Sequence, residues 1–489
     1  MKLRILSLLL LVSAAFAQMR VVAQASKSPL VTFRVVFTTG SAADPVDKPG
    51  LAYLTGMMLA NGGTRQMTYQ QISDALFPMA ASVGVQVDKE MTTFYGATHV
   101  DNLAAYYKLL RGMLLDPGWR ADDFQRVRND AVNSLRVGLR GNDEELAKEA
   151  LYQNIYAGTP YGHYAAGTVT SLEKLTLNDV KGFYHSQYSQ TNLILGIAGG
   201  FSQSFLEAMK KDFRALPQGA GFRPRVKLPA MIDDSRVEII TKDTRSAAIS
   251  IGFPISVTRD SADYPALLVA ASYLGQHRMS GSLLFDEMRS KRGLNYGDYA
   301  YIEYFPRGMY RVEPSPNLAR HEQIFQMWIR PVPPAEAEFA VRLAVYELGK
   351  TMRDGISEQD FERSRDFVEK YANILTRTAS ARLGYAIDSM WYGSPAYDAG
   401  LQIALPNVTR ADVNAVIKRY LRVNRLVITV VTKDGEALKQ QLASGAPSPI
   451  QYASPKPQAI LEADQQAEKW PLDLSSADIQ VVPAPQMFQ

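Results

Sequence analysis

The sequence predicts an α+β fold made of two similar domains. Its 489 residues suit two domains of about 200 residues each. Strand-like and helix-like segments follow one another in the same order in both halves. Thr176 and Asp179 open a predicted helix near the end of the first half, and Thr409 and Asp412 repeat them 233 positions later. The repeated order indicates an internal duplication.

The first half begins with strands and continues with helices. The β-branched and aromatic run at 30–37 predicts a strand. The alternating residues Val83, Val85 and Val87, together with 92–96 beyond a turn, predict a hairpin of half-buried strands. The other predicted elements are helices from about Gly50, at 122–140, at 144–156 and after an N-cap at Thr176, and a buried strand at 192–198.

The second half repeats this order between two irregular segments. Residues 217–235 carry Pro and Gly without periodicity, which predicts a linker. The tail at 446–489 is Pro-rich, and we expect it to lie extended on the surface with Trp470-Pro471-Leu472 as an anchor. The predicted elements between them are strands at 248–253 and 424–430 and a helix at 263–274. The predicted domains are therefore 18–216 and 236–445.

The N-terminus is typical of a secretory signal peptide. Lys2 and Arg4 precede an apolar run from Ile5 to Phe16, and Ala15-Phe16-Ala17 predicts cleavage after Ala17. The run is too short for a membrane span, so no span is expected in the mature chain. The alternative is an ordinary apolar helix at residues 1–17. We expect a periplasmic protein, because an exported chain without cysteine suits that compartment.

Composition excludes several classes of function. Without cysteine there is no disulfide, no thiol catalysis and no lipid attachment to an N-terminal Cys. The 53 basic and 49 acidic residues nearly balance, and no basic stripe with interleaved aromatics is present. Nucleic acid is therefore not an expected partner.

The run Lys48-Pro49-Gly50-Leu51-Ala52-Tyr53-Leu54-Thr55-Gly56-Met57, preceded by Asp44-Pro45, resembles the first signature of the pitrilysin/insulinase-type (inverzincin) zinc metallopeptidases. Those enzymes carry H-x-x-E-H after G-L-A, where the two His bind zinc and the Glu acts as general base. Here Tyr53 stands at the first His, Gly56 at the Glu and Met57 at the second His. The family's third ligand, a Glu 77 residues further on, falls on Ser134. The resemblance therefore implies that this chain binds no zinc.

A buried helix around Tyr53 and a metal site elsewhere in the chain are the two alternatives. The segment around Tyr53 also fits a buried helix, with Leu51, Leu54 and Met58 toward the core. A relocated metal site finds no support, because no two of the five His have metal-ligand spacing and a structural role suits each. These five are His99, His163, His185, His277 and His321.

Residues 283–296, LLFDEMRSKRGLNY, resemble the second signature of the same family, a helix-to-strand corner. In the family an Arg and a Tyr seven residues apart bind the substrate backbone and the scissile carbonyl at the partner half's zinc site. Arg289 and Tyr296 have that spacing, with Gly293-Leu294 before the Tyr. A cation and a phenol there would stabilise a tetrahedral oxyanion. The alternative is that Arg289 is a solvated helix-end cation and Tyr296 a core-edge aromatic.

The resemblance covers about residues 28–440 and implies two homologous domains, each a mostly antiparallel sheet with helices packed on one face. In some bacterial members the catalytic machinery is split between two chains. The resemblance thus implies a non-metal-binding subunit that pairs with an H-x-x-E-H homologue, which holds the zinc, and that takes unfolded peptides as an added strand. The alternatives are a catalytically inactive peptide-binding or assembly scaffold and, less directly, a homodimeric regulator of a processing enzyme.

Overall fold

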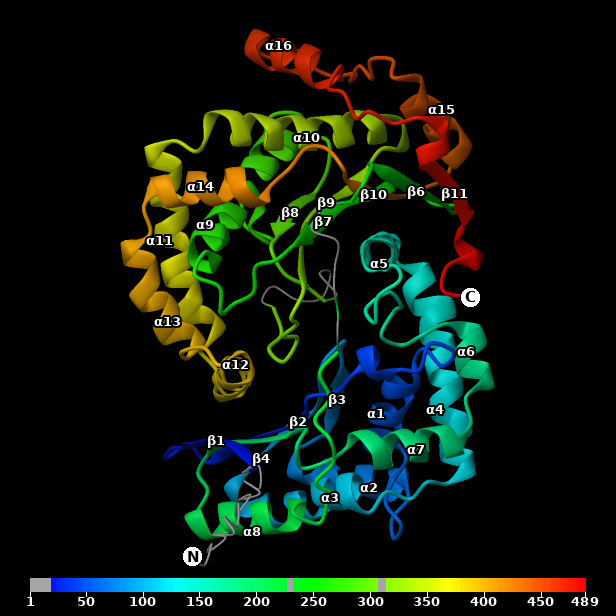
Figure 1. The fold of residues 1–489 in the computed structure, drawn as a ribbon, viewed down its shortest axis with the longest axis vertical. Helices are drawn as coiled ribbons and strands as arrows, with labels where there is room; N and C mark the ends of the chain where they lie inside the picture. Colours follow the sequence, from blue (N-terminus) through cyan, green and yellow to red (C-terminus); the bar gives the residue numbers. More distant parts are fainter. Residues whose placement is uncertain (1–18, 225, 227–231, 307–313) are drawn as a thin grey trace, which may run out of the picture.

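The computed structural model describes residues 19–224, 226, 232–306 and 314–489, so the predicted signal peptide lies outside the described residues. These residues form two domains, each with one sheet and its own helices (Figure 1). The predicted α+β class is confirmed. Among the described residues, no helix is both long and apolar enough to span a membrane.

The first domain holds a five-stranded sheet with the order β1-β5-β2-β4-β3. Only β1 and β5 run parallel; the other pairs are antiparallel. The predicted strand at 30–37, the hairpin and the strand at 192–198 are all present. The strands are β1 (Arg20–Ala25), β2 (Leu30–Phe37), β3 (Gly84–Val87), β4 (Thr92–His99) and β5 (Leu193–Gly199). The helices are α1 (Leu51–Asn61), α2 (Tyr69–Leu76), α3 (Leu103–Leu115), α4 (Ala121–Asn133), α5 (Asp143–Ile155), α6 (Val169–Lys174), α7 (Leu177–Gln187) and α8 (Gln203–Phe213), with a π-helical segment, η4 (Ser134–Leu139), after α4.

The second domain holds a six-stranded sheet with the order β11-β6-β10-β7-β9-β8. Five of these strands repeat the order of the first sheet, and β11 is added at the edge. The strands are β6 (Arg236–Thr241), β7 (Ala247–Ile255), β8 (Gly297–Tyr301), β9 (Gln323–Val332), β10 (Val427–Thr432) and β11 (Ile479–Pro483). The helices are α9 (Tyr264–Gly275), the π-helical η5 (Phe285–Ser290), α10 (Ala337–Asp354), α11 (Glu358–Leu375), α12 (Ala379–Tyr392), α13 (Tyr397–Ala404), α14 (Arg410–Tyr420), α15 (Gly435–Ser444) and α16 (Gln458–Ala467).

The duplicated helix starts are built alike. The Thr176 hydroxyl accepts from the Asp179 amide at 3.2 Å, and the Asp179 carboxylate accepts from the Thr176 amide at 2.8 Å. Thr409 and Asp412 form the same reciprocal pair at 3.2 and 2.9 Å. Both are capping boxes, which satisfy helix N–H groups that have no partner within the helix. Together with the matching strand order, they confirm two homologous domains.

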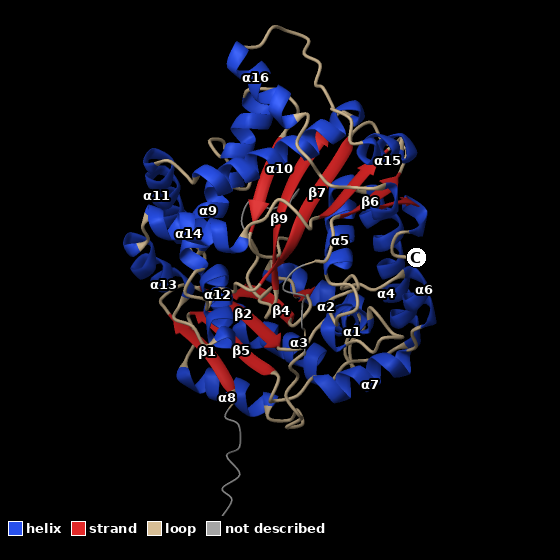
Figure 2. Cartoon of the chain, turned by 45° about the horizontal axis from the view of Figure 1, so that its top comes forward, coloured by secondary structure: helices blue, strands red, loops and turns tan. Residues whose placement is uncertain are grey.

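Each sheet is covered on its second face by a helix of the other domain. Helix α12 crosses β1, β5 and β2, whereas α5 crosses β7 and β10 (Figures 1 and 2). A glycine gives each helix room: a Cβ on Gly196 would come within 2.7 Å of Ile387 Cδ1, and one on Gly252 within 3.3 Å of Leu151 Cδ2. The expected packing on one face thus holds for each domain's own helices. The other face of each sheet is covered by α12 or α5 from the opposite domain.

The tail does not lie extended throughout, which corrects that expectation. It forms α16, and then β11 pairs in parallel with β6. Trp470 anchors it, because Arg342 donates to the Trp470 carbonyl at 2.7 Å. The last residues reach the first domain, where Phe488 is buried in the core and its carbonyl accepts from the Val169 amide at 3.0 Å. The tail therefore contacts both domains.

Candidate functional site

The first signature begins with Asp44, whose side chain caps the N-terminus of α1. The Asp44 carboxylate accepts from the amides of Gly50 and Ala52, each at 2.7 Å, at the N-terminus of α1. Burial raises the pKa of Asp44, partly offset by the hydrogen bond and charge of His163. Gly50 has φ +95°, a left-handed conformation that favours glycine. The part of the signature that positions α1 is therefore intact.

The four zinc-ligand and base positions do not fit zinc. Tyr53 and Met57 are half-buried against the first-domain core, and Ser134 is exposed at the start of η4. A Cβ on Gly56 would lie 2.8 Å from Val87 Cγ2, so β3 occupies the space where a longer side chain would begin. Phenol and thioether are poor zinc ligands, and no general base stands at position 56. In the described part of the chain, no three His, Asp or Glu side chains are grouped to hold a metal ion.

Packing explains the same helix well. Leu54 is fully buried, and Leu51 and Met58 are nearly so, as the buried-helix alternative requires. The five His lie apart and have other neighbours. Those neighbours are Asp101 for His99, Asp44 for His163, Tyr184 for His185, Tyr301 for His277 and Glu90 for His321.

Arg289 and Tyr296 lie on one corner of the second domain. Arg289 is in η5, the chain turns at Gly293 with φ +70°, and Tyr296 directly precedes β8. The Arg289 guanidinium carbon lies 4.7 Å from the centroid of the Tyr296 ring and 4.9 Å from that of Phe285. Its Nη1 also donates to the Tyr296 carbonyl at 3.4 Å. The corner thus brings the two predicted residues together as a cation–π stack.

Tyr296 faces solvent. Its side chain is 74% exposed, whereas Arg289 is half-buried beneath it. The core-edge alternative for Tyr296 is therefore wrong. Beside the stack, burial raises the pKa of Asp298 to about 8, although the Asn295 hydrogen bond and the Arg289 charge lower it in part. At neutral pH Asp298 is therefore mainly a neutral acid and does not tie up Arg289 as an ion pair.

The two signatures belong to different domains of the chain. Helix α1 packs against β3, α4 and α7 of the first domain, and η5 packs against β8 of the second. The cation–π and hydrogen-bond partners of Arg289 are Phe285 and Tyr296, on its own corner. The Arg289–Tyr296 pair therefore lies at the surface of the second domain.

Sequence reasoning missed a buried polar cluster between the domains. Arg320 makes a bidentate ion pair with Asp88 at 2.8 and 2.6 Å, and its guanidinium stacks on Tyr304 at 3.8 Å. Both charged side chains are less than 5% exposed. Next to them, burial and the Arg320 charge lower the pKa of Lys89 to about 8. A run of three charged residues at a hairpin turn normally indicates a solvated turn, so the sequence offered no signal of this cluster.

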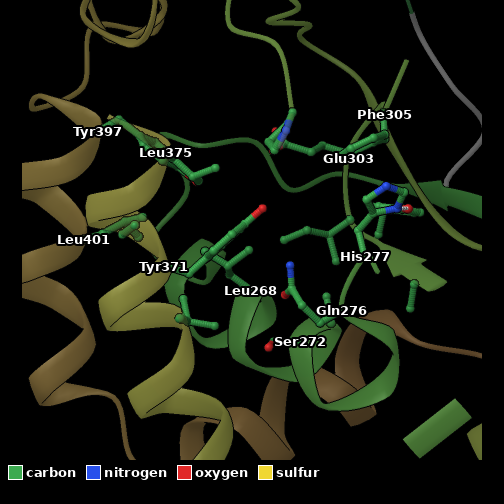
Figure 3. A pocket seen from close by; sticks show the side chains of 17 residues that line it. Leu268, Ser272, Gln276, His277, Glu303, Phe305, Tyr371, Leu375, Tyr397 and Leu401 are labelled. Carbon is green, nitrogen blue, oxygen red and sulfur yellow. Dashed lines mark hydrogen bonds between the residues drawn. The ribbon is translucent and has the colours of Figure 1, made fainter. Parts of the chain in front are cut away.

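Two cavities lie in the second domain. The first, about 70 Å³, is bounded by α9, β8 and α11 and is lined by Leu268, His277 and Tyr371 among others (Figure 3). It has room for a few water molecules but not for a peptide. The second, about 220 Å³, is lined by Arg259 and Asp388, which form an ion pair of 3.1 Å. Neither cavity includes Arg289 or Tyr296.

Several known proteins resemble the chain over most of its length. Residues 20–169 match the family described as "Insulinase (Peptidase family M16)", and residues 174–367 match "Peptidase M16 inactive domain". The chain is 21% identical over 414 residues to a Helicobacter pylori protein named "Non-peptidase homolog YmxG", covering 83% of this chain and 89% of that protein.

Solved structures share the fold. A peptidase M16 inactive domain from Pseudomonas fluorescens has a TM-score of 0.73 at 22% identity, covering 84% of this chain and 94% of that one. A protease from Helicobacter pylori has a TM-score of 0.74 at 17% identity, covering 84% and 96%. Both structures match across the two domains together.

Proposed function

Because the chain belongs to the insulinase (peptidase M16) family but carries no residues that fit the family's zinc, we propose that it is the non-metal-binding subunit of a two-chain peptidase. In this proposal a homologue with an H-x-x-E-H motif binds the zinc and activates water. This chain supplies Arg289 and Tyr296 to that partner's site. The pair would bind the peptide and stabilise the transition state.

The observation that carries the proposal is the exposed Arg289–Tyr296 stack. Attack on a peptide carbonyl places negative charge on its oxygen. A guanidinium and a phenolic O–H can both donate hydrogen bonds to that oxygen, and such donors act most strongly where water is excluded. Tyr296 is 74% exposed in the single chain, so a second subunit could both reach the pair and exclude water from it.

The adjoining sheet edge suits an extended peptide. Strand β8 starts one residue after Tyr296 and is the last strand of its sheet, paired with β9. All residues of β8 except Tyr299 are buried, so a peptide that adds beside this strand would first displace what covers it; it would then gain main-chain hydrogen bonds and run past Tyr296. We therefore propose unfolded peptides as substrates and, from the predicted signal peptide, the periplasm as the compartment.

The test uses the mature chain co-purified with its zinc-bearing partner. Arg289→Ala and Tyr296→Phe should each lower kcat/KM for peptide cleavage by about 10²–10³-fold, because each removes one donor to the oxyanion. The matched control is Arg419→Ala, which removes an exposed Arg whose guanidinium lies 5.9 Å from the Tyr420 ring. Subunit assembly, measured by size-exclusion chromatography, should be unchanged in all three. Equal cleavage by Arg289→Ala and Arg419→Ala complexes would contradict the proposal.

A second candidate is a catalytically inactive scaffold of the same fold. It is favoured by the match to the inactive-domain family and by the likeness to a protein named a non-peptidase homolog. A scaffold would bind peptide or partner without accelerating cleavage. Material purified from the native periplasm separates the two: chelator-sensitive cleavage in the presence of an H-x-x-E-H chain supports the subunit, and binding alone supports the scaffold.

A further inference from the structure

We propose that the first part of the C-terminal tail, residues 446–467, is a buttress that holds the Arg289–Tyr296 corner in place, with Asp464 as its main positioning residue. This inference rests on the proposed function of the corner. This part of the tail lies outside both signature segments, residues 44–57 and 283–296. It therefore adds to the corner something that the two signatures do not contain.

The central contact is a buried ion pair between tail and corner. Arg292, which follows η5, donates from Nε to Asp464 Oδ1 at 2.7 Å. The same guanidinium donates from Nη1 to the Glu287 carbonyl and carboxylate, each at 2.8 Å. Arg292 is 4% exposed and Asp464 5%. Charges removed from water in this way need each other, so the pair fixes Arg292 and, through Glu287, the segment that carries Arg289.

Two further contacts come from the irregular stretch before α16. The Tyr452 hydroxyl donates to Asp464 Oδ2 at 2.7 Å, which holds the carboxylate in its orientation. Lys456 Nζ donates to the Lys291 carbonyl at 2.7 Å. That carbonyl belongs to the end of the helical segment, where acceptors lack partners within the helix. The tail thus makes polar contacts with the corner at two places, Arg292 and the Lys291 carbonyl.

The side chains of Arg289 and Tyr296 make few contacts that would hold them in place. The hydrogen bond from Arg289 to Tyr296 is long, at 3.4 Å, and Tyr296 is mostly in solvent. The turn between them has Gly293 in the left-handed region and is closed by backbone hydrogen bonds from the Gly293 amide to the Arg289 carbonyl at 2.9 Å and from the Leu294 amide to the Met288 carbonyl at 3.0 Å. Arg292 stands one residue before this glycine, so its buried ion pair with Asp464 adds a contact from the tail directly beside the turn.

The first test needs no catalytic activity. In the isolated chain, Asp464→Asn keeps the shape of the side chain but removes its charge. Hydrogen–deuterium exchange of a peptide covering 285–301 should become at least about 10-fold faster, because Arg292 loses its charged partner on the tail and keeps only Glu287, which belongs to the corner itself. Tyr452→Phe removes only one hydrogen bond and should give about a 3-fold increase. Exchange in β11 should stay unchanged and serves as the check that both variants are folded.

The matched control is Glu462→Gln, an exposed residue on the same helix with the same change in charge. It should leave exchange at 285–301 unchanged. An Asp464→Asn corner that exchanges no faster than this control overturns the buttress, whatever its effect on cleavage.

The second test uses the co-purified two-chain complex. Asp464→Asn should lower kcat by about 10-fold and also raise KM, because a displaced Arg289 loses contacts to the transition state and to the bound peptide. Glu462→Gln should have wild-type kcat. If the corner loosens in Asp464→Asn but neither this variant nor Arg289→Ala slows cleavage, the proposed function fails and the buttress contact stands.

Discussion

Asp298→Asn should stabilise the protein, and increasingly so as pH rises. The Asp298 side chain is fully buried, and its Oδ1 accepts a hydrogen bond from the side-chain Nδ2 of Asn295. Its Oδ2 has no hydrogen-bond partner. Burial raises the pKa of this carboxyl from 3.8 to about 8. An asparagine has nearly the same shape and imitates the neutral acid without being able to ionise.

The size and sign of the effect follow from the two pKa values. Below about pH 4 both folded and unfolded chains hold the proton, so ionisation costs nothing. Between about pH 4 and pH 8 the unfolded chain releases it and the folded chain does not, so the free energy of unfolding falls as pH rises. Four pH units at about 1.4 kcal/mol each give an upper limit on the order of 5 kcal/mol, which structural relaxation reduces. Above pH 8 the cost is constant.

Urea unfolding at pH 4.5, 6, 7.5 and 8.5 measures this prediction. The difference in free energy of unfolding between Asp298→Asn and wild type should grow over this series, at equal m values. Asp366→Asn is the control, because that side chain is 55% exposed on α11 and should give a small difference at every pH. A difference for Asp298→Asn that is flat or shrinks with pH would refute a buried neutral carboxyl at this position.

Two further substitutions test the domain interface and the lost zinc site. Asp88→Asn should lower the free energy of unfolding, measured in urea, by about 3–5 kcal/mol, because Arg320 keeps a buried charge without a counter-charge. A decrease below about 1 kcal/mol would contradict an Asp88–Arg320 ion pair that is shielded from water. Gly56→Ala should give no net stabilisation, because a Cβ 2.8 Å from Val87 Cγ2 offsets the gain in helix propensity of about 1 kcal/mol. The control is Gly182→Ala, which should show that gain because no atom lies within 4 Å of its new Cβ. Equal stabilisation of both variants would contradict the close packing.

Local signals were sufficient for most elements. The capping boxes at Thr176 and Thr409 depend on residues within a single helical turn, and the hairpin at 84–99 depends on alternation within each strand. Such patterns are complete in a short window of sequence. The Arg289–Tyr296 corner was instead implied by the resemblance of residues 283–296 to a family signature.

Long-range packing was not predictable in this way. No local pattern in the sequence indicates that α5 and α12 each lie on the sheet of the other domain. Asp88 and Arg320 are 232 residues apart, and single charges in a sequence normally indicate a solvated surface. The pairing of Asp464 with Arg292 is not predictable for the same reason, since the two residues are 172 positions apart and a proline-rich segment indicates no partner.

The two signatures now carry different kinds of residue. In the first, Asp44 still holds the helix start, while Tyr53, Gly56 and Met57 serve packing against β3 and the core. In the second, Tyr296 buries little surface, and an exposed cation–π stack with Arg289 contributes only about 0.5–1 kcal/mol. Folding therefore accounts for the first set and not for the second. Our proposal accordingly assigns peptide chemistry to the second domain, where Tyr296→Phe should remove a hydrogen-bond donor while leaving the free energy of unfolding within about 0.5 kcal/mol of wild type.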